Sequence, residues 1–469
     1  MKEKSVFILF AVFVILGGAF FFAQSRWKRV EEAQRQSNAI LPVETGGVDR
    51  IQIHNSHGAF ELHREGRQWR LTQPLEAKAD SDEISSILYT LASLTVERSF
   101  EDVSDEEKKN YGLDAPPLQV SVEAEGTAYS VSIGKQTATR GRMYAMKSGD
   151  PRVLVLENRL RDRLEKSLYD LRDKSVFSGD VEEAGKIELQ LGQDRFAAAK
   201  DDEGVWRLEE PLGARADRGQ VRALLSDLRS VRIQAFTDES PGNLAAYGLA
   251  DSATRMTVWP VEATPATLLL GQSATDPSRL FAKMTGSDQV FELDAGFAEE
   301  IREKALNLRD RRLASIPAHE CRRVEIRDSA GVLFSASEEE GGQWRMLAPQ
   351  EGTLTYHKIN SLLRDLSDLE IEAFLDRPEP LSAYRLEPPD YEMTFRGNGK
   401  EETLQLGVVP PSATDEWSAE WVYALRPDET SVFAVDRLFV SLVHQDFAEM
   451  IKPPASATDE AEIRADPSE

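Results

Sequence analysis

The chain has 469 residues, which is enough for about three domains of ordinary size. Its 81 acidic and 56 basic residues give a net charge of −25 at pH 7, which disfavours a phosphate backbone as a partner. We therefore expect no nucleic-acid binding. The single cysteine, Cys321, excludes an intrachain disulfide.

Residues 5–24 form an uncharged stretch dominated by Phe, Val, Ile and Leu. About twenty residues are enough for a helix to cross a bilayer core of roughly 30 Å. We interpret this stretch as an uncleaved transmembrane anchor that comes after a basic leader at residues 1–4. A secretory signal peptide is the alternative, but the stretch is long for one, and Phe21-Phe22-Ala23 lacks the small residue that cleavage requires.

The basic residues on the two sides of this anchor leave its orientation open. Their count favours a cytoplasmic C-terminal part. A short leader before a single span commonly directs export of the C-terminal part, and we expect most of the chain on the extracytoplasmic side of the inner membrane. Residues 25–46 are predicted to form a juxtamembrane linker. Residues 453–469, rich in Pro, Ala, Ser, Asp and Glu, are predicted to form a disordered acidic tail.

The chain between these ends contains three copies of one module. Trp69-Arg70-Leu71 with Pro74 returns as Trp206-Arg207-Leu208 with Pro211 and as Trp344-Arg345-Met346 with Pro349, in steps of 137 and 138 residues (206 − 69 and 344 − 206). Later landmarks recur in the same order: Phe100, Phe236 and Phe374; Tyr111, Tyr247 and Tyr384; Gly134, Gly271 and Gly407; and Tyr144-Ala145, Phe281-Ala282 and Tyr423-Ala424. We place the modules at residues 47–178, 179–315 and 316–452.

Each module is predicted to be α+β, with a mostly antiparallel sheet and two helices. Apolar residues at alternate positions, such as Ile51 and Ile53, place one face of a strand on a core. The Pro after each Trp should end its strand because it cannot donate a backbone hydrogen bond. A helix with one apolar stripe should come next, and a closing helix is expected at 158–170, 295–307 and 436–446.

The landmarks shared by all copies are of the kind that builds a core, so we interpret them as structural. An exposed Trp at the same place in three modules could line a ligand cleft, but packing under the first helix is the interpretation that we favour. The Tyr-Gly-Leu element is predicted to be a turn whose Gly has a positive φ, although the third copy has Arg385 there.

One charged pair recurs just after the closing helix. It is Arg172-Asp173 in the first copy and Arg309-Asp310 in the second, whereas the third copy has only Gln445-Asp446 in that region. The next module begins about a dozen residues later, and no module comes after the third copy. Arg172, Asp173, Arg309 and Asp310 are therefore candidates for a domain interface.

Other polar residues give no catalytic or metal-binding pattern. His54, His57 and His63 have no counterparts in the other copies and cannot supply about four tetrahedral ligands. Cys321 has no local His partner. No phosphate-binding glycine loop, nucleophile elbow or zinc-protease helix occurs. No polar group is shared by all three copies in a way that indicates an active site, and we expect no catalytic residue, no cofactor and no metal.

The N-terminal span, the Trp69-Arg70-Leu71-x-x-Pro74 unit and its repeats, Phe100, and Tyr111-Gly112-Leu113 together resemble the bacterial domain-of-unknown-function family 4340. The Ile133-Gly134 strand end with Tyr144-Ala145 after it adds to the resemblance, which covers about residues 48–450. Members of that family are membrane-anchored, have no established activity, and are often encoded beside ABC-type transporter components similar to those of gliding-motility systems. The resemblance implies no catalytic residue.

Taken with the triplication, the resemblance favours a single-span, non-enzymatic scaffold of the bacterial envelope with protein partners. ABC-type transporter subunits are the partners that the resemblance implies. The alternative is an extracytoplasmic receptor that binds a ligand or glycan in clefts near the Trp strands.

Overall fold

The computed structural model describes residues 40, 44–177, 181–261, 264–273, 276–409, 421–426 and 428–451. The predicted anchor at 5–24, nearly all of the linker before residue 44 and the tail at 453–469 lie outside these residues. Within the described part of the chain, no helix is long and apolar enough to cross a bilayer.

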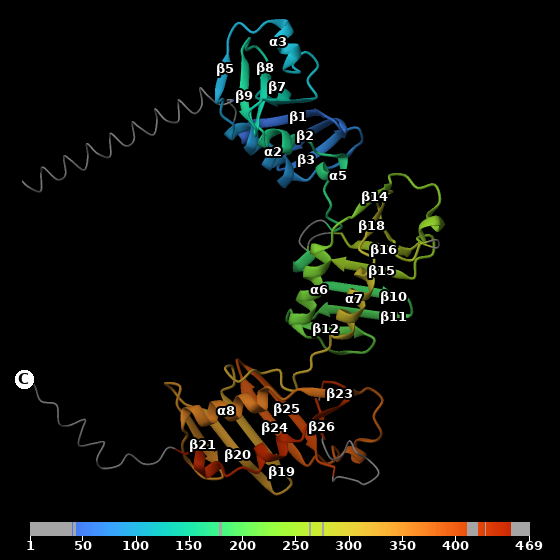
Figure 1. The fold of residues 1–469 in the computed structure, drawn as a ribbon. Helices are drawn as coiled ribbons and strands as arrows, with labels where there is room; N and C mark the ends of the chain where they lie inside the picture. The colour runs from blue at the N-terminus through green and yellow to red at the C-terminus, as the bar shows by residue number, and fades with distance from the viewer. Residues whose placement is uncertain are drawn as a thin grey trace, which may run out of the picture. The chain divides into compact units, whose positions relative to one another are not determined.

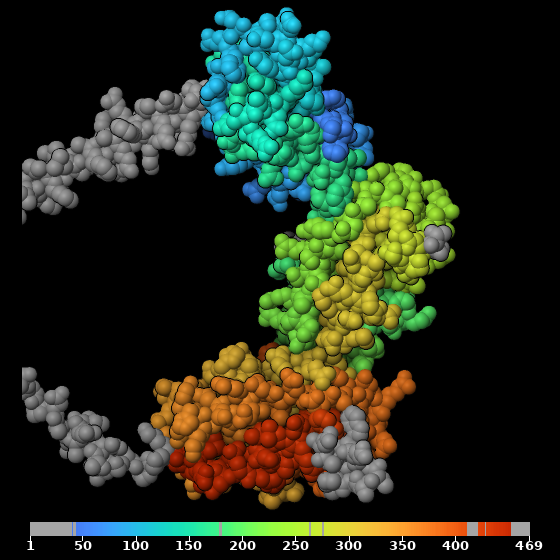
Figure 2. Space-filling model, viewed as in Figure 1, coloured from blue at the N-terminus to red at the C-terminus, as the bar shows by residue number. Residues whose placement is uncertain are grey.

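Each module is built on one nine-stranded antiparallel sheet, and the three sheets share one strand order (Figure 1). The orders are β4-β3-β2-β1-β6-β7-β8-β9-β5, β13-β12-β11-β10-β15-β16-β17-β18-β14 and β22-β21-β20-β19-β24-β25-β26-β27-β23. The prediction of tandem, mostly antiparallel sheets is thus confirmed. Each module forms a closely packed body in the space-filling view (Figure 2).

The first sheet consists of β1 (Val48–Asn55), β2 (Gly58–Glu65), β3 (Gln68–Gln73), β4 (Ala77–Lys78), β5 (Arg98–Phe100), β6 (Leu118–Ala124), β7 (Thr127–Gln136), β8 (Arg142–Lys147) and β9 (Val153–Glu157). The second consists of β10 (Lys186–Leu191), β11 (Asp194–Lys200), β12 (Trp206–Glu210), β13 (Ala214–Arg215), β14 (Ala235–Asp238), β15 (Thr254–Trp259), β16 (Ala266–Gln272), β17 (Leu280–Met284) and β18 (Val290–Leu293). The third consists of β19 (Arg323–Asp328), β20 (Gly331–Glu338), β21 (Trp344–Ala348), β22 (Gly352–Thr353), β23 (Ile371–Leu375), β24 (Tyr391–Gly397), β25 (Lys400–Gly407), β26 (Trp421–Leu425) and β27 (Val432–Asp436).

The long helix of each module comes after its Trp strand. These helices are α2 (Ser81–Ser93), α6 (Arg218–Ser230) and α8 (Tyr356–Ser367). The side chain of Asp80 accepts a hydrogen bond from the backbone N–H of Glu83 and so caps α2. The apolar stripe of α2 is buried and covers one face of the first sheet, since Ile84, Ile87 and Leu91 belong to the same core cluster as the strand residues.

The closing helix is shorter than predicted. In the first module it breaks into α4 (Arg159–Leu164) and α5 (Leu168–Leu171), because Ser167 starts a new capping box. The second and third modules have α7 (Phe297–Leu306) and α9 (Leu438–Val443), and a 3₁₀ turn, η6 (Phe447–Met450), comes after α9. The acidic stretch after Phe100 contains a helical turn, α3 (Asp105–Asn110), with its own capping box at Ser104.

Two of the repeated landmarks lie against each other. The backbone N–H of Lys135 donates to the carbonyl of Tyr111 at 2.8 Å, so the strand end at Gly134 touches the Tyr-Gly-Leu turn. A Cβ at Gly134, Gly271 or Gly407 would lie 2.0–2.3 Å from the carbonyl oxygen of the repeated Tyr. The turn has a positive φ in all three copies: 72° at Gly112, 67° at Gly248 and 55° at Arg385.

The rings of the repeated Tyr and of the aromatic-Ala pair are in contact in every module. The centroid distances are 4.0 Å for Tyr111 and Tyr144, 5.1 Å for Tyr247 and Phe281, and 4.9 Å for Tyr384 and Tyr423. The repeated sequence landmarks therefore fix how the Tyr-Gly-Leu turn packs on the sheet.

Contacts group the chain into two compact units. The first comprises Met1–Val176, Val231–Pro241 and Gln289–Leu293, and the second comprises Phe177–Ser230, Gly242–Asp288 and Asp294–Glu469. Part of the second module thus belongs with the first module. The residues around Arg172 therefore lie within the first unit, and those around Arg309 lie within the second.

We expect Gly271→Ala to lower the free energy of unfolding by about 2 kcal/mol, because the added methyl group would overlap the Tyr247 carbonyl 2.3 Å away. Gly185→Ala in the same module is the control, since nothing lies within 4 Å of a Cβ there. Urea unfolding measures both. Equal stability of the two variants would contradict the close approach.

Candidate functional site

In every module, the segment at the C-terminal end of the module lies beside the residues that precede the long helix. Isolated bridges join Ala79 to Arg172, Ala216 to Arg309, and Leu354 to Ile451. The backbone N–H groups that start the helices donate to the neighbouring exit residues at 2.8–2.9 Å: Asp80 to Leu171, Asp217 to Leu308 and Thr355 to Met450.

These bridges correct the assignment of the third exit. Ile451 stands where the first two copies have Arg172 and Arg309, so Gln445-Asp446 is not the equivalent segment. No residues are inserted before this exit: Ile451 lies 18 residues after Phe433, as Arg309 does after Phe291 (451 − 433 and 309 − 291), so η6 takes the place that α5 has in the first module. The side chain of Ile451 packs on the core of its own module.

At the first junction, the Arg172 guanidinium lies 3.6 Å from the centroid of the Phe236 ring, in stacking distance. Its Nη1 and Nη2 donate to the two carboxylate oxygens of Glu239, the second at 3.2 Å. Arg172 is only 4% exposed. A planar, permanently charged guanidinium is suited to this arrangement because it can stack and form a bidentate pair at once.

We call the contacts of Arg172 with Phe236 and Glu239 the first joint, and the corresponding contacts of Arg309 the second joint. Two further hydrogen bonds support the first joint. Gln289 Nε2 donates to Glu239 Oε2 at 2.7 Å, and the Tyr169 hydroxyl donates to the Ile233 carbonyl at 2.9 Å. Burial acts to raise the pKa of Glu239, but the hydrogen bonds from Arg172 and Gln289 outweigh it and hold the pKa below its usual value. The carboxylate therefore stays ionised opposite the arginine.

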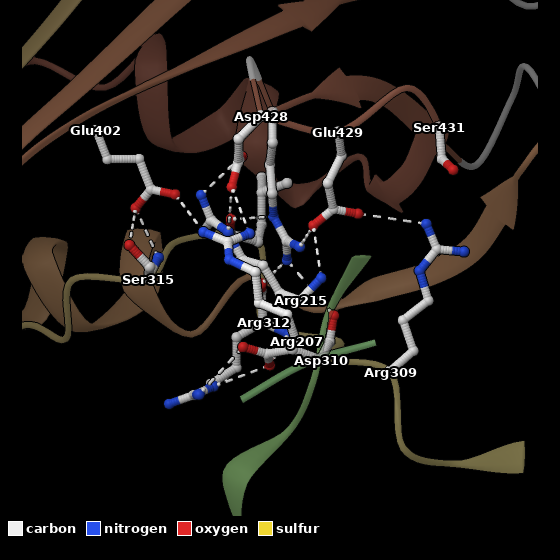
Figure 3. Close-up of polar contacts among 12 residues, drawn as sticks. Arg207, Arg215, Arg309, Asp310, Arg312, Ser315, Glu402, Asp428, Glu429 and Ser431 are labelled. Atoms are coloured by element: carbon white, nitrogen blue, oxygen red, sulfur yellow. Dashed lines mark hydrogen bonds and ion pairs between the residues drawn. The ribbon is translucent and has the colours of Figure 1, made fainter. Parts of the chain in front are cut away.

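The second junction repeats the arrangement with Arg309. Its guanidinium lies 3.9 Å from the centroid of the Phe374 ring, and Nη1 donates to Asp376 Oδ1 at 2.6 Å. Nη2 lies 3.4 Å from Glu429 Oε2 (Figure 3). Both predicted arginines thus reach an aromatic ring and a carboxylate beyond the next module's long helix.

The first module lacks the stacking ring. The strand pairs place Phe236 opposite Phe291 and Phe374 opposite Phe433, and the same register places Ser99 opposite Leu154. Phe100 is therefore one position away from the predicted equivalence, and a shift of one residue points a side chain to the other face of a strand. Among the described residues, the second and third modules thus have the ring at this position, and the first has Ser99.

The predicted aspartates do not cross the junctions. Asp173 Oδ1 accepts from the backbone N–H of Ser175 at 2.9 Å, and Asp310 Oδ1 accepts from that of Arg312 at 3.1 Å. Each carboxylate thus shapes the turn by which its own segment enters the next module.

A buried ion pair lies at the centre of the second joint. Arg426 and Glu429 have 0% and 1% of their side chains exposed, and Arg426 Nη1 donates to Glu429 Oε1 at 2.6 Å. Arg426 Nε donates to the Leu313 carbonyl at 3.0 Å, and Nη2 donates to the Arg312 carbonyl. Burial lowers the pKa of Arg426 from its usual value. The guanidinium thus ties the segment that enters the third module to that module's sheet.

Arginines of the second module complete this joint. Arg215 donates to Glu402 at 2.5 Å and to Asp428 at 3.0 and 3.1 Å, and Arg207 donates to Asp428 at 3.3 Å (Figure 3). Glu402 also accepts from the backbone N–H and hydroxyl of Ser315 at 2.6 and 2.7 Å. Burial acts to raise the pKa of Asp428, but its bonds with Arg215 and Arg207 lower it overall.

Arg426 and its surroundings are specific to the third module. Ala424 lies opposite Leu406 and Ala282 lies opposite Leu270, so Met284 stands at the position of Arg426 in the second module. The pair could not be predicted from the sequence, because neither Arg426 nor Glu429 belongs to a repeated motif.

The remaining predicted residues lie apart from the joints. Trp69, Trp206 and Trp344 are 4–6% exposed, which leaves little of each ring for a ligand. Pro74, Pro211 and Pro349 come directly after the ends of β3, β12 and β21, and each is preceded by a cis peptide bond.

The side chains considered for metal binding or thiol chemistry are also separate. His63 pairs with Glu61 at 2.7 Å, and no group of three or more His, Cys, Asp or Glu residues able to hold a metal occurs among the described residues. Cys321 is buried, and burial raises the pKa of its thiol to about 11.

All three copies share one polar feature that the repeated sequence motifs do not reveal. Two hydroxyl residues face each other across neighbouring strands in each module: Ser121 and Ser130, Thr257 and Thr267, and Thr394 and Thr403. The two Thr pairs have Oγ1–Oγ1 distances of 3.0 and 2.8 Å. This pair was missed because Ser replaces Thr in one copy.

Comparison with known proteins identifies the family. The model of the family described as Domain of unknown function (DUF4340) matches residues 69–205 and 206–389, and both segments begin at a repeated Trp. No curated protein matches the chain. Among solved structures, DNA polymerase III subunit beta from Borrelia burgdorferi in complex with a natural product aligns over 87% of this chain and 95% of its own. Its identity is 7% and its TM-score is 0.13, so it carries no structural argument.

We expect Arg426→Met to lower the free energy of unfolding by about 3 kcal/mol, because Glu429 would stay buried without its closest cation. The double variant with Glu429→Gln should recover part of this loss. Urea unfolding measures both, with Arg345→Met as the control, since that arginine is 44% exposed and pairs only with exposed carboxylates. A loss no larger than that of the control would show that the pair does not stabilise the joint.

For the first joint, we expect Arg172→Ala and Phe236→Ala to be coupled, because the guanidinium stacks on this ring. A double-mutant cycle by urea unfolding should give a coupling free energy of about 1 kcal/mol. The same cycle with Arg152→Ala in place of Arg172→Ala is the control, because Arg152 pairs with Asp150 on the surface. Additive effects of Arg172→Ala and Phe236→Ala would rule out the stacking contribution.

Proposed function

We propose that this chain, which belongs to the Domain of unknown function (DUF4340) family, is a non-enzymatic scaffold of the bacterial envelope that is anchored in the inner membrane. The two joints carry this proposal. In both, a nearly buried arginine from one module stacks on a ring of the next and pairs with a carboxylate there. Charged residues are thus used to join modules in series.

The ends of the series support the same function. The ring is replaced by Ser99 in the first module, and the arginine is replaced by Ile451 in the third module. Among the described residues, the stacking pair is found at the two places where modules meet, which supports a role in joining them. Its role as a scaffold for membrane proteins, with ABC-type transporter subunits as the partners, is part of the proposal and is based on the family resemblance.

The test combines topology with partner capture. A C-terminal tag on the full chain should be digested by protease added to intact spheroplasts, and the protein should leave the membrane fraction only with detergent. Transporter subunits should co-purify with the full chain. The double variant Arg172→Ala/Arg309→Ala should lose this co-purification, because it disrupts both joints.

The variant Arg345→Ala is the control, since that arginine lies on the surface of the third module, and it should keep the partners. Circular dichroism verifies that the modules of the double variant stay folded. Full protection of the tag, or capture of the same partners by the folded double variant, would contradict the proposal.

A further inference from the structure

The second module has a groove on the face of its sheet opposite the helices. Buried and exposed side chains alternate along β10, with Ile187, Leu189 and Leu191 on the core side. The groove lies over β10, β11, β15 and β16 and has a volume of about 790 Å³. This is within the range of small-molecule sites, roughly 300–1,000 Å³. A smaller hollow of about 450 Å³ lies over the corresponding strands of the first module.

Comparison of the three copies shows that the floor of this groove is specialised. Strand registers give three positions at which the second module is apolar and the other two modules are polar. The apolar residues of the second module, each with its polar equivalents in the first and third modules in parentheses, are Trp259 (Glu123 and Arg396), Leu269 (Ser132 and Gln405) and Ala197 (Glu61 and Ser335). Since all three modules have the same sheet, the stability of that sheet does not require apolar residues at these positions.

Polar groups surround this apolar floor without a net charge. Lys186, Arg195 and Arg255 are balanced by Glu188, Glu209 and Glu210 in the lining. Lys186 Nζ pairs with Glu188 at 3.1 Å and with Glu209 at 2.9 Å, and it lies 5.5 Å from the centroid of the Trp259 ring. The Thr257–Thr267 hydroxyl pair also lines the groove. Balanced charges of this kind disfavour a strongly anionic or cationic ligand.

The groove is unsuited to an extended peptide that adds to a sheet. β10, β11, β15 and β16 are interior strands, paired on both sides, so their backbone groups are already used. Recognition must therefore come from side chains. One half-buried indole, aliphatic floor residues and a rim of carboxylates, hydroxyls and guanidinium groups fit a ligand that has an apolar face and many hydroxyl groups.

We propose that this groove binds an uncharged carbohydrate chain. The Trp259 ring packs against the C–H face of a sugar ring, while Glu188, Arg255 and the Thr257–Thr267 pair exchange hydrogen bonds with its hydroxyl groups. This site is independent of the two joints and goes beyond the proposed scaffold function.

Calorimetric titration of the full chain with maltotetraose, cellotetraose and chitotetraose tests the proposal, with Trp fluorescence as the second signal. At least one of these neutral tetrasaccharides should bind saturably. Trp259→Glu should weaken binding about tenfold or more, because it removes the stacking surface. The substitution copies Glu123 of the first module, so the sheet should accept it, and circular dichroism verifies this.

Arg396→Ala is the matched control, because it changes the equivalent position of the third module and should leave binding unchanged. A loss of binding in Trp259→Glu alone supports the site. The proposal is overturned if none of the three sugars binds at millimolar concentration, if Trp259→Glu binds as well as the original chain, or if only an acidic oligosaccharide or a peptide binds. Loss of partner capture in the joint variants has no bearing on these outcomes.

Discussion

The order of the modules depends on one interaction: an arginine at the end of one module stacks on an aromatic ring of the next. A guanidinium can be buried in this way only when its charge is compensated, because desolvation of an unpaired ion is costly. Glu239 provides this compensation at the first junction, and Asp376 with Glu429 provides it at the second. The ring adds a flat surface that matches the planar cation. The joint thus needs a residue from each side of the junction.

The two joints differ in how much charge they bury. The first consists of one arginine, one ring and one carboxylate supported by Gln289. The second adds the Arg426–Glu429 pair and the contacts of Arg215 with Glu402 and Asp428. Where the third module has Arg426, the second has Met284. A fully buried ion pair restricts the geometry of the junction, because separating its two members would leave uncompensated buried charges and would strongly destabilise the protein. The same module scaffold therefore supports one junction with few ion pairs and another with many.

The sequence predicted the repeated sheets because the alternation and the Trp, Tyr and Gly landmarks are local signals. Arg172 and Arg309 could also be found, since they recur at fixed spacing beside a module boundary. Their carboxylate partners could not, because Glu239 and Asp376 lie 67 residues further along the chain and differ in their place relative to the shared Ala-Phe-x-Asp: Asp376 is its last residue, whereas Glu239 comes directly after it. The shared residue type set Phe100 one position out of register, whereas the spacing from the repeated Trp shows the difference: it is 31 residues in the first copy (100 − 69) and 30 in the others (236 − 206 and 374 − 344). Trp259 could not be singled out either, because only comparison of aligned strands reveals that it is exceptional.

Ser99 and Ile451 have a consequence when many copies of the chain are close together. An end-to-end contact that uses different surfaces on its two sides can in principle add subunits without limit and form fibres. Here the entrance of the first module has no ring to receive an arginine, and the exit of the third has no arginine to offer, because Ile451 is used by its own core. Neighbouring copies therefore cannot extend the series through this contact. Among the described residues, this stacking contact therefore joins modules within one chain and does not join modules of separate copies.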